Sequence, residues 1–237
     1  MLKGMDMDQQ NDNYIKKSFD VLPEDVLRWY PWVGENYSKT KILIVGESHY
    51  GVCKETLEWY LKSKEGTIEV IKALITGKKW AQDNKTLNNF SKSLVGDNDY
   101  TNEVLWNKLA YYNFIQRPMN YISPNKERPT NDDFIKGCKT FKQVINILKP
   151  SICIFIGVEA SWRVICSFEQ KDSNRDCHIS GKLNRINLRP IVTVNMPYGQ
   201  TKLIFTKHSS RYYNWSGWHN YLKQSIPNEI KILSDKV

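Results

Sequence analysis

Four short runs made up mostly of apolar residues limit the folds open to this chain more than any other feature. They occupy residues 41–45, 109–115, 151–156 and 202–206, and residues 190–194 have a similar character. A run of this length that stops at a glycine or a polar cluster is typical of a strand buried on both faces. We therefore expect a sheet that is covered on both sides.

Segments with helical spacing of apolar residues lie between these runs, at residues 54–76, 133–148, 159–168 and 215–225. Thr130 is the expected N-cap of the second of these helices, because Asp132 and Asp133 follow in its first turn. The alternation predicts an α/β fold, a three-layer αβα sandwich around a mostly parallel sheet of four to five strands. Residues 77–103, rich in Asn and Lys, are expected to be irregular.

The length of 237 residues matches a single domain over residues 1–237, with a core at about 40–225 and a flexible stretch at 1–20. The N-terminus has no signal-peptide pattern and the apolar runs are only strand-sized, so we expect a cytoplasmic protein without a membrane segment. The five cysteines are an odd number and include no C-x-x-C pair, so neither a disulfide scaffold nor a zinc or iron–sulfur site is expected. We also expect no cofactor.

The formal net charge of +9 favours a polyanionic partner. DNA or RNA is the first expectation and an anionic membrane surface the second, while a basic but inert surface is the alternative. The chain is expected to act as a monomer.

Chemically rich residues follow the apolar runs, and the carboxyl ends of parallel strands share one rim of a sheet. Gly46–Tyr50 follows the first run, Asn113 lies in the second, Gly157 follows the third, and His208–Arg211 follow the fourth. We expect these segments to face a common cleft.

Two of these segments carry candidate catalytic chemistry. In the first, Gly46 permits a sharp turn, Glu47 and His49 are candidate acids or bases, and Ser48 is a hydrogen-bonding group or weak nucleophile. The second, residues 208–213, joins a histidine, two hydroxyls, an arginine and two tyrosines, which suits contact with phosphates and bases. The structural alternatives are loop solvation for the first segment and packing of the last helix for the second.

The ordered segments ILIVGESHY (42–50), YYNFIQRP (111–118), VINILKPSICIFIGVEA (144–160) and HSSR (208–211) resemble the uracil-DNA glycosylase superfamily. Members carry a G-x-[DNA]-P-[YGS] loop, an Asn that ends the second strand, an apolar segment ending in LG-x-x-A, and an H-P-S loop. The resemblance spans roughly residues 40–225 and is nearest to the iron–sulfur branch, whose first loop begins Gly-Glu.

The resemblance implies a role for each matching residue. Asn113 would read the edge of a flipped base, and His208 would stabilise the departing base. Tyr50 would flank the base and Phe90 would stack on it, while Ser209, Ser210 and Arg211 would grip the DNA. From the residues themselves, we add Gly46 to the base site, because it permits close backbone approach, and Tyr212 to the DNA site, because it is one of two paired aromatics.

This chain departs from the family pattern at several positions. Ser48 stands where several branches use Asp or Asn to handle the attacking water, His49 replaces the loop proline, and Ser209 replaces the proline after the histidine. Only Cys138 matches the cluster cysteines, so no iron–sulfur cluster is expected.

The resemblance implies a DNA glycosylase that flips a uracil or modified base out of double- or single-stranded DNA and hydrolyses its N-glycosidic bond. Glu47 or His49 would activate the water. A nucleic-acid-binding module of the same fold, with Ser48 marking lost catalysis, is the alternative. An esterase using Ser48 with His49 or His208 ranks last, because the G-x-S-x-G elbow is missing.

Overall fold

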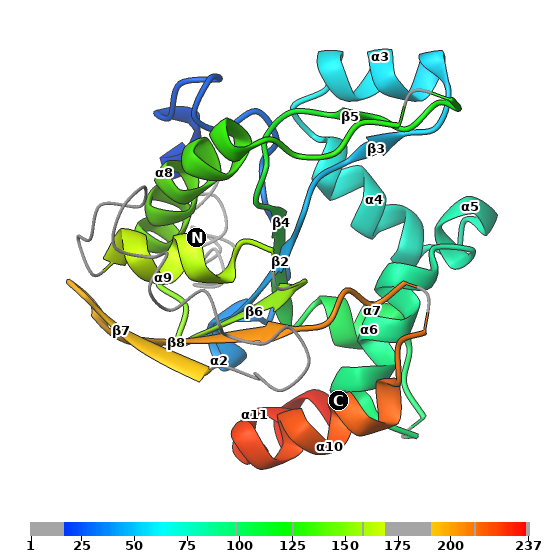
Figure 1. Ribbon diagram of the computed structural model, residues 1–237. Coiled ribbons are helices and arrows are strands. Elements are labelled where there is room, and N and C mark those ends of the chain that lie inside the picture. The colour runs from blue at the N-terminus through cyan, green and yellow to red at the C-terminus, as the bar shows by residue number, and fades with distance from the viewer. Residues whose placement is uncertain are drawn as a thin grey trace, which may run out of the picture.

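The computed structural model describes residues 17–97, 99–124, 126–157, 159–168, 191–210 and 212–235. Residues 1–16, most of the stretch expected to be flexible, and Arg211 lie outside these ranges. The protein is an α/β fold with a six-stranded mixed sheet in the order β1-β4-β2-β6-β8-β7 (Figure 1).

The four central strands are parallel and coincide with the four apolar runs. They are β2 (Ile42–Gly46), β4 (Leu109–Asn113), β6 (Ile152–Ile156) and β8 (Gly199–Thr206). Two antiparallel strands flank them: β1 (Trp32–Val33) on β4 and β7 (Ile191–Met196) on β8. The prediction of four to five strands was wrong, because the two-residue β1 is too short for any periodic signal.

Alternate residues of the buried strands face two separate hydrophobic cores. One core sits beneath α8 (Asn131–Leu148) and α9 (Ser161–Phe168) and includes Leu43 and Val45. The other includes Ile42 and Ile44 and lies beneath the helices on the opposite face of the sheet. Helices therefore cover both faces of the sheet (Figure 1), as the continuous apolar runs predicted.

The helices of the second face have the following bounds: α4 Gly66–Ile75, α6 Lys85–Val95, α7 Asn102–Trp106, α10 Trp215–Ser225 and α11 Pro227–Ser234. The remaining elements are α2 (Tyr37–Thr40), α3 (Lys54–Lys62), α5 (Lys79–Gln82) and a two-stranded sheet of β3 (Tyr50–Gly51) with β5 (Met119–Asn120).

Two expectations about helices were wrong. The helix expected over 54–76 is broken into α3 and α4, because Ser63 is extended and the chain turns before Gly66, which packs against Trp29. Residues 77–103 are not irregular: they form α5, α6 and the start of α7. Asn84 caps α6 by accepting a hydrogen bond from the backbone N–H of Leu87 at 3.2 Å.

Candidate functional site

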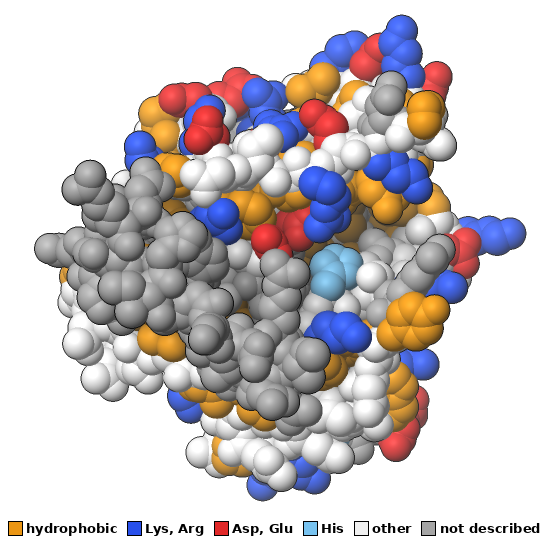
Figure 2. Space-filling model, viewed as in Figure 1, with side chains coloured by type: hydrophobic (Ala, Val, Ile, Leu, Met, Phe, Trp, Pro, Cys, Tyr) orange, Lys and Arg blue, Asp and Glu red, His pale blue; other side chains and the backbone are white. Residues whose placement is uncertain are grey.

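The carboxyl ends of the four parallel strands open onto one cleft of about 700 Å³. Figure 2 shows this hollow, with a histidine at its centre and both basic and acidic side chains around it. The sequence-predicted residues that line it are Gly46, Glu47, Ser48, His49, Tyr50, Asn113, Gly157, His208 and Ser210. Gly46 and Ser210, 164 residues apart in the chain, therefore meet at the rim, as the parallel arrangement predicts.

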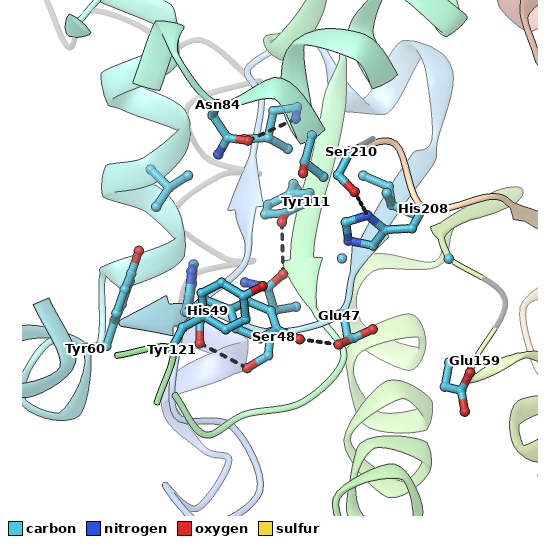
Figure 3. A pocket seen from close by; sticks show the side chains of 18 of the residues that line it. Glu47, Ser48, His49, Tyr60, Asn84, Tyr111, Tyr121, Glu159, His208 and Ser210 are labelled. Carbon is cyan, nitrogen blue, oxygen red and sulfur yellow. Dashed lines mark hydrogen bonds between the residues drawn. The ribbon is translucent and has the colours of Figure 1, made fainter. Parts of the chain in front are cut away.

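Asn113 forms part of the cleft wall and offers an unused hydrogen-bond donor. The side chain is 1% exposed, and its Oδ1 accepts a hydrogen bond from the Tyr111 hydroxyl at 2.9 Å (Figure 3). Burial raises the pKa of Tyr111, which keeps the phenol protonated as the donor. The buried Nδ2 of Asn113 has no hydrogen-bond partner among the residues that the structure describes. A buried amide N–H without a partner is costly, so a ligand acceptor would stabilise it.

Gly46 makes room for this arrangement. It pairs in register with Asn113 on the neighbouring strand. A Cβ atom at position 46 would lie 2.3 Å from Asn113 Oδ1 and 2.4 Å from the Tyr111 hydroxyl oxygen. Only glycine, which has no Cβ atom, leaves room for the Asn113 and Tyr111 side chains over the end of β2.

Glu47 is held on one side of the cleft by two partners on the same oxygen. Its Oε1 accepts a short hydrogen bond from the Tyr50 hydroxyl, and Arg128 Nη2 lies 3.6 Å away. The Glu47 side chain is 13% exposed, whereas that of Arg128 is 67% exposed. No hydrogen bond reaches Glu47 Oε2 from the described part of the chain. This oxygen can therefore accept a proton or a hydrogen bond from a ligand or water.

His208 also lines the cleft, with its ring near Glu47 (Figure 3). The ring Nδ1 lies 3.0 Å from the Ser210 hydroxyl. Burial lowers the pKa of His208, the charge of Glu47 opposes this shift, and the charge of Arg128 adds to it. The imidazole is therefore neutral at neutral pH, and Ser210 can fix which nitrogen carries its proton.

His49 and Ser48 take structural roles. His49 Nε2 lies 2.9 Å from the Thr67 hydroxyl, and its ring stacks on Tyr60 with centroids 4.4 Å apart. Burial lowers the pKa of His49 to about 3, which makes it too weak a base to activate water at neutral pH. The Ser48 hydroxyl donates to the backbone carbonyl of Arg117 at 2.7 Å rather than to a histidine, which removes the basis for the esterase alternative.

Several predicted site residues do not line the cleft. Phe90, the expected stacking ring, is fully buried in the core beneath α6. Ser209 is fully buried, and its hydroxyl donates to the carbonyl of Thr86 at 2.7 Å, so it anchors the loop to α6. Tyr212 is 92% exposed and stands outside the cleft, in a left-handed conformation with φ 55°.

Sequence reasoning missed Tyr111, Arg128 and Trp80, which also line the cleft. Tyr111 had a usable signal: it lies two residues before Asn113, so strand alternation puts both on one face. The segments that hold Arg128 and Trp80 carry no motif, and only the folded chain brings them to the rim.

No family model and no curated protein sequence matches this chain. Within the described residues, no three His, Cys, Asp or Glu side chains gather closely enough to hold a metal ion. The helices that the structure describes are too short or too polar to cross a bilayer.

Proposed function

We propose that the protein is a DNA glycosylase that binds a flipped uracil or modified base in the cleft and hydrolyses its N-glycosidic bond. The observation that carries this proposal is the convergence of Glu47, Asn113 and His208 on one cleft of about 700 Å³. That volume falls within the range of small-molecule sites. The motif resemblance assigns a base to the same three strand ends.

In the proposed mechanism, Asn113 and His208 act on the base. The free Nδ2 donor of Asn113 binds an acceptor on the base edge. The Ser210 hydroxyl donates to Nδ1 of His208, which leaves the ring proton on Nε2. That N–H donates to the base oxygen that gains charge as the C1′–N bond breaks and its electron pair moves to the base.

Glu47 acts on the water in this mechanism. The water oxygen attacks C1′, which has oxocarbenium character, and its proton passes to the Glu47 carboxylate. The products are the free base, which takes up one proton, and an abasic sugar with a hydroxyl at C1′. Tyr50 and Arg128 orient the carboxylate through Oε1 and leave Oε2 for the water.

The test is a base-release assay with single- and double-stranded DNA that contains uracil, hypoxanthine or modified cytosines, read by mass spectrometry. We expect His208→Ala to slow release by about 10²- to 10³-fold and Glu47→Gln by about 10²- to 10⁴-fold. His219→Ala, a half-buried histidine on α10, and Glu103→Gln, an exposed carboxylate on α7, are the matched controls: neither residue lines the cleft, so both variants should retain activity.

Two outcomes would contradict the proposal. One is that no base is released from any substrate and His208→Ala leaves DNA affinity unchanged. The other is base release that survives both Glu47→Gln and His208→Ala. DNA binding without release, lost in the cleft variants, would favour the nucleic-acid-binding module instead.

A further inference from the structure

The cleft wall formed by α5 carries a large aromatic side chain that the proposed hydrolysis does not use. Trp80 lies on this four-residue helix, lines the cleft and is 54% exposed. An exposed tryptophan leaves much apolar surface in water, and at a cleft mouth this is typical of a binding contact.

Trp80 differs from the tyrosines that line the cleft in its ring contacts. The others already have ring or cation partners: Tyr60 with His49, Tyr111 with Trp106, Tyr50 with Tyr121, and Lys126 over Tyr121. No such partner of Trp80 is found in the part of the chain that the structure describes. The 54% exposed ring of Trp80 can therefore stack on a planar ligand without breaking a ring or cation contact among the described residues.

The surroundings of Trp80 are basic. Exposed Lys78 and Lys79 precede it, exposed Lys85 follows on α6, and Asp83 is the one acidic residue between them. Lys207 and Arg128 add two cations among the residues that line the cleft, beside the two carboxylates Glu47 and Glu159. An aromatic platform flanked by cations suits an unpaired nucleotide, whose base stacks while its phosphates contact lysines.

We propose that Trp80 is the stacking platform for an unpaired nucleobase next to the nucleotide held in the cleft. The substrate class would then be DNA that is single-stranded at and beside the target base. This inference rests on the proposed function for the identity of the inner nucleotide. It assigns the stacking role to α5 instead of to the buried Phe90.

The test measures binding of a fluorescein-labelled single-stranded oligonucleotide of mixed sequence by anisotropy at fixed salt. We expect Trp80→Ala to raise Kd about 5- to 100-fold, and Trp80→Phe to restore most of the affinity. Trp59→Ala is the matched control, because Trp59 is 40% exposed on α3 and does not line the cleft. Thermal unfolding of each variant checks that the fold is intact.

A second arm uses an oligonucleotide of the same length with abasic sites, which keeps the phosphates and removes the bases. Stacking on Trp80 predicts that wild type and Trp80→Ala bind this strand equally. The inference is overturned if the wild type binds no single strand, or if Trp80→Ala binds the normal strand within about twofold of wild type. It is also overturned if Trp59→Ala weakens binding as much as Trp80→Ala does, or if the affinity that Trp80→Ala loses is lost on the abasic strand as well. Tighter binding of a fully paired duplex than of the single strand would also overturn it.

These results are separable from the proposed function, because binding is measured without base release. A protein that binds through Trp80 but releases no base refutes only the glycosylase. A protein that releases base with an unchanged KM in Trp80→Ala refutes only the stacking platform.

Discussion

His49 shows how a titratable residue next to a candidate site can serve the fold alone. Its ring sits between Trp29 and Tyr60, with centroid distances of 4.7 Å and 4.4 Å, and burial lowers its pKa to about 3. In the unfolded chain a histidine has its ordinary pKa near 6.5, so below that pH the unfolded state binds a proton that the folded state does not. Stability from this site is therefore fully present above pH 6.5 and is lost as the pH falls toward 3.

We predict that the free energy of unfolding of His49→Gln falls less steeply than that of the wild type as the pH is lowered below 7. Gln can still reach the Thr67 hydroxyl but does not titrate. The wild type should lose up to about 3 kcal/mol from this site between pH 7 and pH 4. Denaturant unfolding across this range measures the effect, and His219→Gln is the control. Parallel profiles for wild type and His49→Gln would contradict the assignment.

The sequence could place Glu47, Asn113 and His208 at the rim, because strand ends and motif order fix their positions. It could not separate Glu47 from His49, two residues apart in the same loop. Their difference arises from packing: α3 and α4 supply Tyr60 and Thr67, which surround the imidazole. Such contacts come from distant segments and leave no local pattern.

At the level of elements, two lysines from the sheet region donate hydrogen bonds to backbone carbonyls at the C-terminal ends of the last two helices. Lys108, immediately before β4, donates to the carbonyls of Ile232 and Asp235 at 2.9 Å and 2.7 Å. Lys202 of β8 donates to the carbonyl of Ser225 at the end of α10, at 3.1 Å. Cations at helix C-termini bind the last free carbonyls and complement the helix dipole.

We predict that Lys108→Met lowers the free energy of unfolding by about 1–3 kcal/mol, because it removes two hydrogen bonds from a charged donor. Amide hydrogen exchange should speed up first in α11. Lys231→Met, an exposed lysine on the same helix, should change stability by less than about 0.5 kcal/mol. Equal losses in the two variants would show that Lys108 has no capping role.

The long buried elements were the predictable ones. The runs at β2, β4, β6 and β8 and the Thr130-capped helix α8 have strong periodic or capping signals, and all five form. The helices in 77–103 were missed because α5 has four residues and α6 is rich in Asn and Lys. Their stability comes from packing on the sheet, for example through Phe90, and not from local propensity.

For the molecule as a whole, the net charge of +9 means that the nucleic-acid binding we propose should weaken with salt. The double variant Lys78→Gln/Lys79→Gln should reduce the slope of log Kd against log salt by about 1.4 on a single strand, if both lysines contact phosphates. Lys54→Gln/Lys62→Gln on α3 removes the same charge away from the cleft. Identical slopes in the two double variants would refute a local phosphate track beside Trp80.

The packing of the Tyr111 and Asn113 side chains over the end of β2 has a consequence for how the sequence can evolve. A side chain at position 46 would collide with the amide of Asn113 and the phenol of Tyr111, so these three positions cannot drift independently. A homologue that keeps the tyrosine and the asparagine must also keep the glycine. Covariation of this triplet across two adjacent strands is thus a sharper criterion for recognising distant relatives than the loop motif at residues 46–50.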